Sequence, residues 1–287
     1  MKKALVTLTI GERYCANFKK YCHVKWSKYA KEHNLDLIVI EDIIDDSPKA
    51  QSRSPAWQKC LVLSYENVKK YDQVAWIDSD IIINPASPSV FENVPLEMIG
   101  AVDDYATPNE EDHRLALKRL YEHWSKNGVK FISNISPTDY HRNFGFDGEF
   151  KSVVQTGVLV LSPKYHNGLL EHVYNSYEDK GGAEWNYEMR PLSYEILTNK
   201  LAYWLTPKFN MPWPFIKQFL YPFLDSSGSY IPRTMNLLLR KAELNRKTSL
   251  LSKCATIAFL NSYFLHFAGS FDEMRCVNQE INSIFEI

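Results

Sequence analysis

Two aspartates with one residue between them stand in the sequence Asp78-Ser79-Asp80. They directly follow the apolar run Gln73–Ile77, which reads as a short buried strand. In open α/β sheets, ligands bind beyond the carboxyl ends of the strands, where this pair would lie. Mg²⁺ and Mn²⁺ take a few carboxylates, several waters and the phosphate oxygens of a bound nucleotide. The pair could therefore hold a divalent ion that carries a diphosphate.

The Asp-x-Asp pattern alone leaves several interpretations open. Both carboxylates can bind one ion if a turn or a bridging water brings them together. They can equally cap the strand and accept hydrogen bonds from turn amides. A strand ending in Asp-x-Asp also builds the phosphoaspartate site of Mg²⁺-dependent phosphohydrolases. That class places the pattern near its first strand and follows it with Thr or Val, whereas Ile81 and Ile82 follow here.

The segments around the pattern decide between these interpretations. Residues 55–85, PAWQKCLVLSYENVKKYDQVAWIDSDIIINP, place a W-x-K helix and a hydrophobic strand before the two aspartates. Four more segments follow in order: Val154–Val160, Glu188–Leu192, Leu205–Asn210 and Phe264–Gly269. Together they resemble the GT-A-fold glycosyltransferases, especially the galactosyl/xylosyltransferase and glycogenin-like families. Two positions depart from the family pattern, because Gln155 stands where Asn is usual and Met189 where Gln is usual.

The resemblance implies a function and a set of site residues. The family moves a hexosyl or pentosyl unit from a UDP-sugar to a glycan or glycolipid acceptor, with retention of configuration and with Mn²⁺ or Mg²⁺. The metal ligands would be Asp78, Asp80 and His266, and the catalytic residues Glu188, Gln155 and Lys59. The donor would contact a larger set: Thr7, Thr9, Tyr14, Lys59, Asp78, Ser79, Asp103, Asp104, Gln155, Thr156, Gly157 and Gly269.

Several of these residues also have an ordinary structural interpretation. His266 lies in an aromatic run and could be a core histidine, and Lys59 could be a solvated helix residue. Thr7, Thr9 and Tyr14 could simply end a strand, and Asp103-Asp104 could form a turn. The departures at Gln155 and Met189 would also fit a glycosyltransferase-like protein that binds without turnover.

Hydrophobic periodicity predicts alternating strands and helices that would position these residues. The expected strands are Ala4–Ile10, Leu35–Ile40, Gln73–Ile77, Met98–Val102 and Val153–Leu161. The expected helices are Asn17–His33, Trp57–Lys70, Glu110–Lys126, Leu169–Tyr177 and Arg190–Asn199. This order predicts an α/β fold with a mixed, mostly parallel sheet covered on both faces.

Composition narrows the function classes. The 287 residues suit one domain, 1–287, and 33 Lys and Arg against 34 Asp and Glu leave no global charge to attract nucleic acid. Neither G-x-G-x-x-G nor a Walker A motif occurs, which disfavours dinucleotide oxidoreductases and P-loop NTPases. Five cysteines without a C-x-x-C pair favour a cytoplasmic setting, and no apolar stretch reaches the length of a membrane span.

The segment 215–253 differs from the rest and is expected to form a helical, basic insertion or lid. It carries seven basic residues against Asp225 and Glu243, namely Lys217, Arg233, Arg240, Lys241, Arg246, Lys247 and Lys253. Aromatic and leucine residues accompany them, which suits a lipid-linked acceptor or peripheral contact with an anionic membrane. A packed helix with a solvated basic face is the alternative.

Overall fold

The computed structural model of the chain describes residues 1–126, 136–179, 187–224 and 250–278. Its strands are β1 (Lys3–Leu8), β2 (Asp36–Ile40), β3 (Gln73–Ile77), β4 (Ile81–Ile83), β5 (Ile99–Asp103), β6 (Val154–Leu161), β7 (Ala202–Trp204), β8 (Met211–Pro212) and β9 (Phe264–His266). Its α-helices are α1 (Glu12–Asn17), α2 (His23–Glu32), α3 (Pro48–Gln51), α4 (Glu110–Lys126), α5 (Pro137–Arg142), α6 (Pro163–Ser176), α7 (Met189–Thr198), α8 (Trp213–Leu220) and residues 250–261. A π-helix, η1 (Phe18–Cys22), and four 3₁₀ helices, η2 (Pro55–Ser64), η4 (Pro207–Asn210), η5 (Pro222–Leu224) and η6 (Phe271–Cys276), complete the described elements.

The central sheet has six strands in the order β2-β1-β3-β6-β5-β7. β1 pairs in parallel with β2 and β3, and β5 pairs in parallel with β7. β6 runs antiparallel to both of its neighbours, β3 and β5. The predicted mixed, mostly parallel sheet is therefore confirmed, with the antiparallel strand at its centre.

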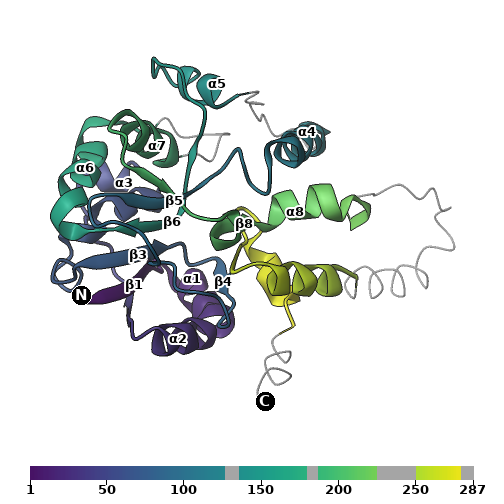
Figure 1. Cartoon of the computed structure of the whole chain (residues 1–287), viewed down its shortest axis with the longest axis horizontal. Coiled ribbons are helices and arrows are strands. Elements are labelled where there is room, and N and C mark those ends of the chain that lie inside the picture. Colours follow the sequence, from purple (N-terminus) through teal and green to yellow (C-terminus); the bar gives the residue numbers. More distant parts are fainter. Residues whose placement is uncertain (127–135, 180–186, 225–249, 279–287) are drawn as a thin grey trace, which may run out of the picture.

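Side chains alternate along each strand between two cores on opposite faces of the sheet. On β3, Ala75 and Ile77 join the core that includes Trp26 of α2, whereas Val74 and Trp76 join the core that includes Leu192 of α7. Figure 1 shows α2 on one side of the sheet and α6 and α7 on the other. The helices thus cover both faces and leave the carboxyl ends of β1 and β3 together at one edge.

A second, three-stranded sheet in the order β4-β9-β8 extends the fold beyond β3. β9 comes from near the end of the chain and pairs antiparallel with β4, which follows the two aspartates. The sequence prediction missed β8 and β9, because strands of two and three residues show no recognisable period. This small sheet matters for function because it carries His266 beside the aspartates.

Three helix predictions need correction. The helix expected at Leu169–Tyr177 is α6, which already begins at Pro163, directly after β6. The first helix begins at Glu12, earlier than the expected Asn17, and passes through the π-helix η1 before α2. The expected α-helix Trp57–Lys70 is instead the 3₁₀ helix η2, which ends at Ser64. Ser54 caps η2 with its side chain, and Pro55 occupies the first turn, where no amide donor is needed.

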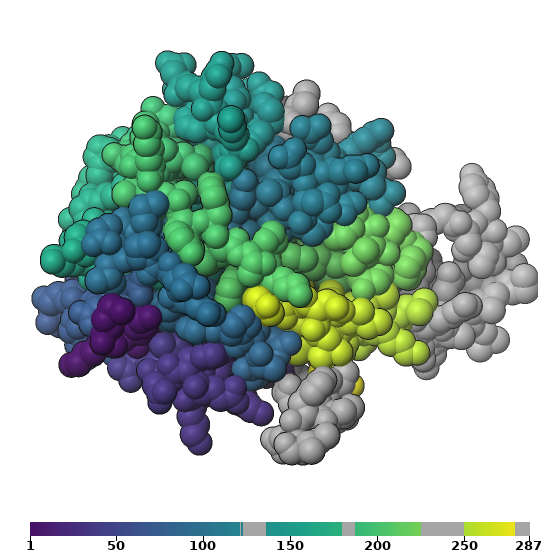
Figure 2. Space-filling model, viewed as in Figure 1, coloured from purple at the N-terminus to yellow at the C-terminus, as the bar shows by residue number. Residues whose placement is uncertain are grey.

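The region expected as an insertion begins with α8, which packs with residues 250–261 in one core. In Figure 2 these segments, green and yellow, form adjacent parts of one surface. Residues 225–249 lie outside the described residues, so the basic helix expected there, and the single-domain organisation, stay predictions. Within the described ranges no helix has the length and apolar character needed to cross a membrane, and all five cysteines are free thiols.

Candidate active site

A tight turn directly after β3 brings the two aspartates to one side. The amide of Asp78 donates to the carbonyl oxygen of Gly157 (2.9 Å), which continues the ladder between β3 and β6. The amide of Ile81 then donates to the carbonyl oxygen of Asp78 (3.2 Å) and closes the turn. Trp26 Nε1 and Cys22 Sγ donate to the Ile81 carbonyl at 2.9 and 3.2 Å. The continuous helical segment of η1 and α2, which packs against one face of the sheet, therefore anchors the turn.

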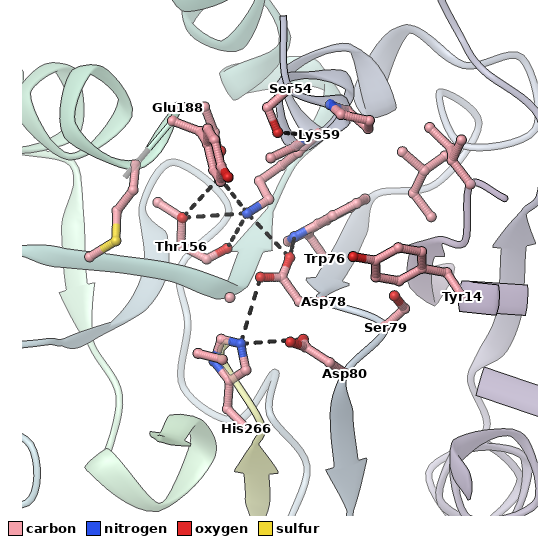
Figure 3. Close-up of a pocket in the computed structure, with 18 of the residues that line it drawn as sticks. Tyr14, Ser54, Lys59, Trp76, Asp78, Ser79, Asp80, Thr156, Glu188 and His266 are labelled. Atoms are coloured by element: carbon pink, nitrogen blue, oxygen red, sulfur yellow. Dashed lines mark hydrogen bonds and ion pairs between the residues drawn. The ribbon is translucent and has the colours of Figure 1, made fainter. Parts of the chain in front are cut away.

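His266 reaches the aspartates through strand pairing. In the β4–β9 ladder His266 lies opposite Ile81, and the amide of Phe267 donates to the carbonyl oxygen of Asp80 at 3.0 Å. The ring Nε2 lies 3.3 Å from Asp80 Oδ1 and 3.9 Å from Asp78 Oδ2, as Figure 3 shows. One ligand atom from each residue lies within 4.8 Å of the others.

This group could hold a metal ion. Two ligand atoms at about 2.1 Å from the same small divalent ion are at most about 4.2 Å apart, so only small side-chain shifts would be needed. Two carboxylates and one imidazole form a donor set suited to Mn²⁺-type ions. Asp78 and Asp80 keep 27% and 21% of their side chains exposed, which leaves room for further ligands from a bound molecule.

The three groups shift one another's protonation. Burial lowers the pKa of His266, but the charge and hydrogen bond of Asp80 outweigh it and raise this pKa above its ordinary value. Burial likewise raises the pKa of Asp80, yet His266 outweighs it and holds that pKa below its usual range. Burial raises the pKa of Asp78 despite the charges of Lys59 and His266. A proton on His266 and a divalent ion would therefore compete for the same place.

Lys59 lies buried between two carboxylates. Its Nζ is 2.6 Å from Glu188 Oε1 and 3.2 Å from Asp78 Oδ1, with the carbonyl oxygen of Thr156 also at 3.2 Å. Burial lowers the pKa of Lys59, but the charges of Asp78 and Glu188 outweigh it and raise this pKa. Lys59 is therefore the cation of the site. The alternative of a solvated helix residue is wrong, because only 4% of its side chain is exposed.

The two carboxylate oxygens of Asp78 have different partners. Its Oδ1 accepts a hydrogen bond from Trp76 Nε1 (2.9 Å) and faces Lys59, whereas Oδ2 faces His266. This division neutralises part of its charge without occupying the oxygen that a metal ion would use. Sequence reasoning missed Trp76, because its period along the strand assigns it only to the core.

These side chains line a cavity of about 400 Å³ at the carboxyl edge of the sheet. Its walls bring together most of the residues singled out from the sequence. Figure 3 labels Tyr14, Lys59, Asp78, Ser79, Asp80, Thr156, Glu188 and His266, and Gln155 and Gly157 also line the cavity. Ser54, Pro55, Ala56, Tyr187 and Met189 also line it. None of these five was predicted as a site residue, although Met189 stands out in the sequence as a departure from the family pattern.

Five of the predicted donor-binding residues do not line this cavity. Thr7 is fully buried in β1, and Thr9 is also buried. Gly269 is exposed, with a positive φ of 67° that ends β9 in a turn. Asp103 Oδ1 accepts hydrogen bonds from the backbone amides of Tyr105 and Val153. This is the turn role that the sequence offered as the alternative to sugar binding. Burial, with the neighbouring Asp103, raises the pKa of Asp104 to about 7.

The structure is similar to several solved structures, although neither a protein-family model nor a curated protein sequence matches the chain. One is a glycosyltransferase involved in glycosylating the major capsid of PBCV-1, with 12% identity, a TM-score of 0.49 and coverage of 96% of this chain and 100% of that one. Galactosyltransferase LgtC, solved with donor and acceptor sugar analogs, gives 14% identity, a TM-score of 0.42 and coverage of 98% and 99%. Mouse xyloside xylosyltransferase 1 has 10% identity and a TM-score of 0.40, and the match covers 74% of this chain and 88% of that one.

All three are glycosyltransferases. This is the class of enzyme that the sequence motifs resemble. At identities of 10–14% and TM-scores below 0.5, these likenesses carry no argument about the function of this chain. The function proposed for the chain therefore rests on the side chains of its own cavity.

Proposed function

We propose that the chain is a metal-dependent glycosyltransferase that takes its sugar from a nucleoside-diphosphate donor. One observation supports this above the others: Asp78 and Asp80 present ligand atoms within 4.8 Å of one another and of one from His266, which lies more than half of the sequence away. They do so at the wall of a cavity that also contains a buried lysine and a buried glutamate. A purely structural ion-pair cluster would have no need of the cavity.

In this proposal the three residues hold Mn²⁺ or Mg²⁺, which when bound supplies electrostatic and Lewis-acid stabilisation of the departing diphosphate. Lys59 would stabilise the diphosphate through the long-range attraction of its positive charge, because its Nζ already contacts Glu188, Asp78 and Thr156 directly. Its positive charge offsets part of the negative charge of the two carboxylates. The cavity can thus accept an anionic diphosphate next to Asp78.

The donor is proposed to be a UDP-sugar. Tyr14 is half exposed at the cavity wall, where its ring could stack on the uracil base. Glu188 and Gln155 would lie beside the hexosyl or pentosyl unit, and transfer would retain configuration, as the sequence resemblance implies. A glycan or lipid-linked molecule would be the acceptor, and residues 215–253 are proposed as its surface or as a peripheral membrane contact.

A panel of sugar nucleotides tests this function. Purified chain with Mn²⁺ should release nucleoside diphosphate from at least one UDP-sugar faster than from GDP- or CMP-sugars. Release should stop when Mn²⁺ is chelated and should fall sharply in Asp80→Asn. Hydrolysis of phosphate monoesters with Mg²⁺, without release from any sugar nucleotide, would instead support a phosphohydrolase. Mn²⁺-dependent binding of UDP without turnover of any donor would indicate a non-catalytic binding protein.

A further inference from the structure

A chain of three buried hydrogen bonds leads away from the ring of His266. His266 Nδ1 lies 2.8 Å from Asn210 Oδ1, and Asn210 Nδ2 lies 2.6 Å from Gln155 Oε1. Gln155 Oε1 also lies 2.6 Å from the backbone nitrogen of Gly157. Asn210 is fully buried and Gln155 is 8% exposed, so both side chains are largely shielded from solvent.

The backbone amide fixes the direction of the whole chain. An N–H of the main chain can only donate, so the Gln155 atom facing Gly157 must be the carbonyl oxygen. That oxygen can only accept, so Asn210 must turn its NH₂ group toward Gln155 and its own oxygen toward His266. The Gln155 NH₂ group also faces His266 Nδ1, at 3.5 Å, but the Asn210 oxygen is much closer, at 2.8 Å, so Nδ1 donates to Asn210 and carries a hydrogen. In the neutral ring the lone pair then lies on Nε2, the atom that faces Asp78 and Asp80.

Without this chain the opposite tautomer would be favoured. Asp80 Oδ1 lies 3.3 Å from Nε2 and is an acceptor, so it attracts a hydrogen to the same nitrogen that a metal ion needs as a lone pair. We propose that Asn210, oriented by Gln155, is a positioning residue that keeps the hydrogen of neutral His266 on Nδ1 and so keeps Nε2 ready to bind a divalent ion. Gln155 then acts through its oxygen on Asn210, in addition to the place beside the sugar that the proposed function gives it.

The close approach at Gly157 supports this assignment. A Cβ atom at position 157 would lie 2.6 Å from His266 Cε1, 2.8 Å from Nδ1 and 3.0 Å from Gln155 Oε1. The glycine therefore lets the ring and the amide come together against the backbone. The departure from Asn to Gln at position 155 also gains a reason, because the longer side chain reaches both Asn210 and Gly157.

This inference rests on the proposed metal site, and its first test needs no metal. In ¹⁵N NMR of the metal-free protein, recorded at a pH high enough that the ring nitrogen signals no longer change with pH, wild-type His266 should carry its hydrogen on Nδ1. Asn210→Leu should move it mainly to Nε2, and Gln155→Met, which frees Asn210 to rotate, should give a mixture. If His266 keeps the Nδ1–H form in a folded Asn210→Leu variant, or shows the Nε2–H form in the wild type, the inference is wrong.

The second test is Mn²⁺ affinity measured by calorimetry without any donor. Loss of such a hydrogen-bond partner typically weakens metal binding about 10–100-fold, which is the change expected for Asn210→Leu. Gln73→Leu is the matched control, since it also removes a buried amide side chain, whose Nε2 donates to the carbonyl oxygen of Val94 at 3.0 Å, but at the opposite end of β3 from Asp78. Its Mn²⁺ affinity should stay that of the wild type.

The two tests separate this inference from the proposed function. A wild-type protein that binds no Mn²⁺ would overturn the proposed metal site, while the tautomer measurement would still decide the role of Asn210. Equal Mn²⁺ affinity in the wild type and Asn210→Leu would overturn the positioning role and leave the metal site intact. A loss of affinity in Gln73→Leu as large as in Asn210→Leu would mean that the effect is general destabilisation, and it would also overturn the positioning role.

Discussion

Replacing Lys59 by methionine should destabilise the fold strongly, because it leaves a buried carboxylate without its cation. Lys59 and Glu188 both have 4% of their side chains exposed, and their charged atoms are 2.6 Å apart. Removing one partner of a buried ion pair typically costs about 3–5 kcal/mol. Asp78, the other partner, is 27% exposed, so solvent can compensate for part of that loss. We therefore expect Lys59→Met to lower the free energy of unfolding by about 3 kcal/mol.

Adding Glu188→Gln to the Lys59→Met variant should recover much of the lost free energy of unfolding, since it removes the uncompensated negative charge. The double variant should be more stable than the sum of the two single changes predicts, by about 2 kcal/mol. Urea denaturation provides all four free energies, with unchanged m-values as the check that the denatured state is the same. Lys69→Met is the matched control: its partner Glu66 is 80% exposed and the lysine 54%, so the effect should stay below about 1 kcal/mol.

Two results would refute this reasoning about Lys59. A cost for Lys59→Met no greater than that for Lys69→Met would mean that the buried charges are not paired as described. Strictly additive effects of Lys59→Met and Glu188→Gln would mean that the two side chains do not interact. Either outcome would also remove the basis for assigning Lys59 an electrostatic role beside the diphosphate.

Three further predictions follow from the same structure. Gly157→Ala should weaken Mn²⁺ binding about 10-fold or more in calorimetry, because its Cβ would lie 2.6 Å from His266 Cε1 and displace the ring; unchanged affinity would contradict the geometry. Tyr14→Ala should weaken UDP binding about 10-fold with little change for free Mn²⁺, since stacking on a base contributes about 1–3 kcal/mol; equal losses for both ligands would refute the base-stacking role. Burial lowers the pKa of His113 from 6.5 to about 4, so the unfolded chain binds a proton that the folded chain excludes. The protein therefore loses free energy of unfolding through His113 as the pH falls from 6.5 toward 4, and loses none through it above pH 6.5. In urea titrations at several pH values, His113→Gln should reduce this loss by up to roughly 3 kcal/mol. The same pH dependence in the wild type and the variant would contradict the lowered pKa of His113.

Much of the sheet could be predicted from the sequence, because its buried strands are continuous apolar runs. Gln73–Ile77 was predicted with the bounds that β3 has, and α4 likewise spans Glu110–Lys126 as expected. The antiparallel direction of β6 could not be read from its residues, since a strand buried on both faces has the same composition in either direction. The 3₁₀ form of η2 was missed for a related reason, because its apolar spacing also fits an α-helix.

The candidate site was predictable in its residue types and less so in its connections. Asp78 and Asp80 follow a strand and are visible as a pattern, whereas their proximity to His266 depends on a three-residue strand, β9, that pairs across most of the chain. The sequence could not show that Lys59 is buried, since a lysine on a helix is usually solvated. Nor could it show that Gln155 faces Asn210, because that contact depends on the local geometry of β6 and η4.

The most direct test of the central claim is a crystal structure of the chain soaked with Mn²⁺ and UDP, with anomalous diffraction recorded at the manganese absorption edge. We predict one strong anomalous peak within coordination distance of Asp80, Asp78 and His266 Nε2, with the diphosphate of UDP on its open side. The same soak of Asp80→Asn should show that peak reduced or lost. No peak at these residues in the wild type, or UDP bound elsewhere with this cluster still closed by its own ion pairs, would contradict the account.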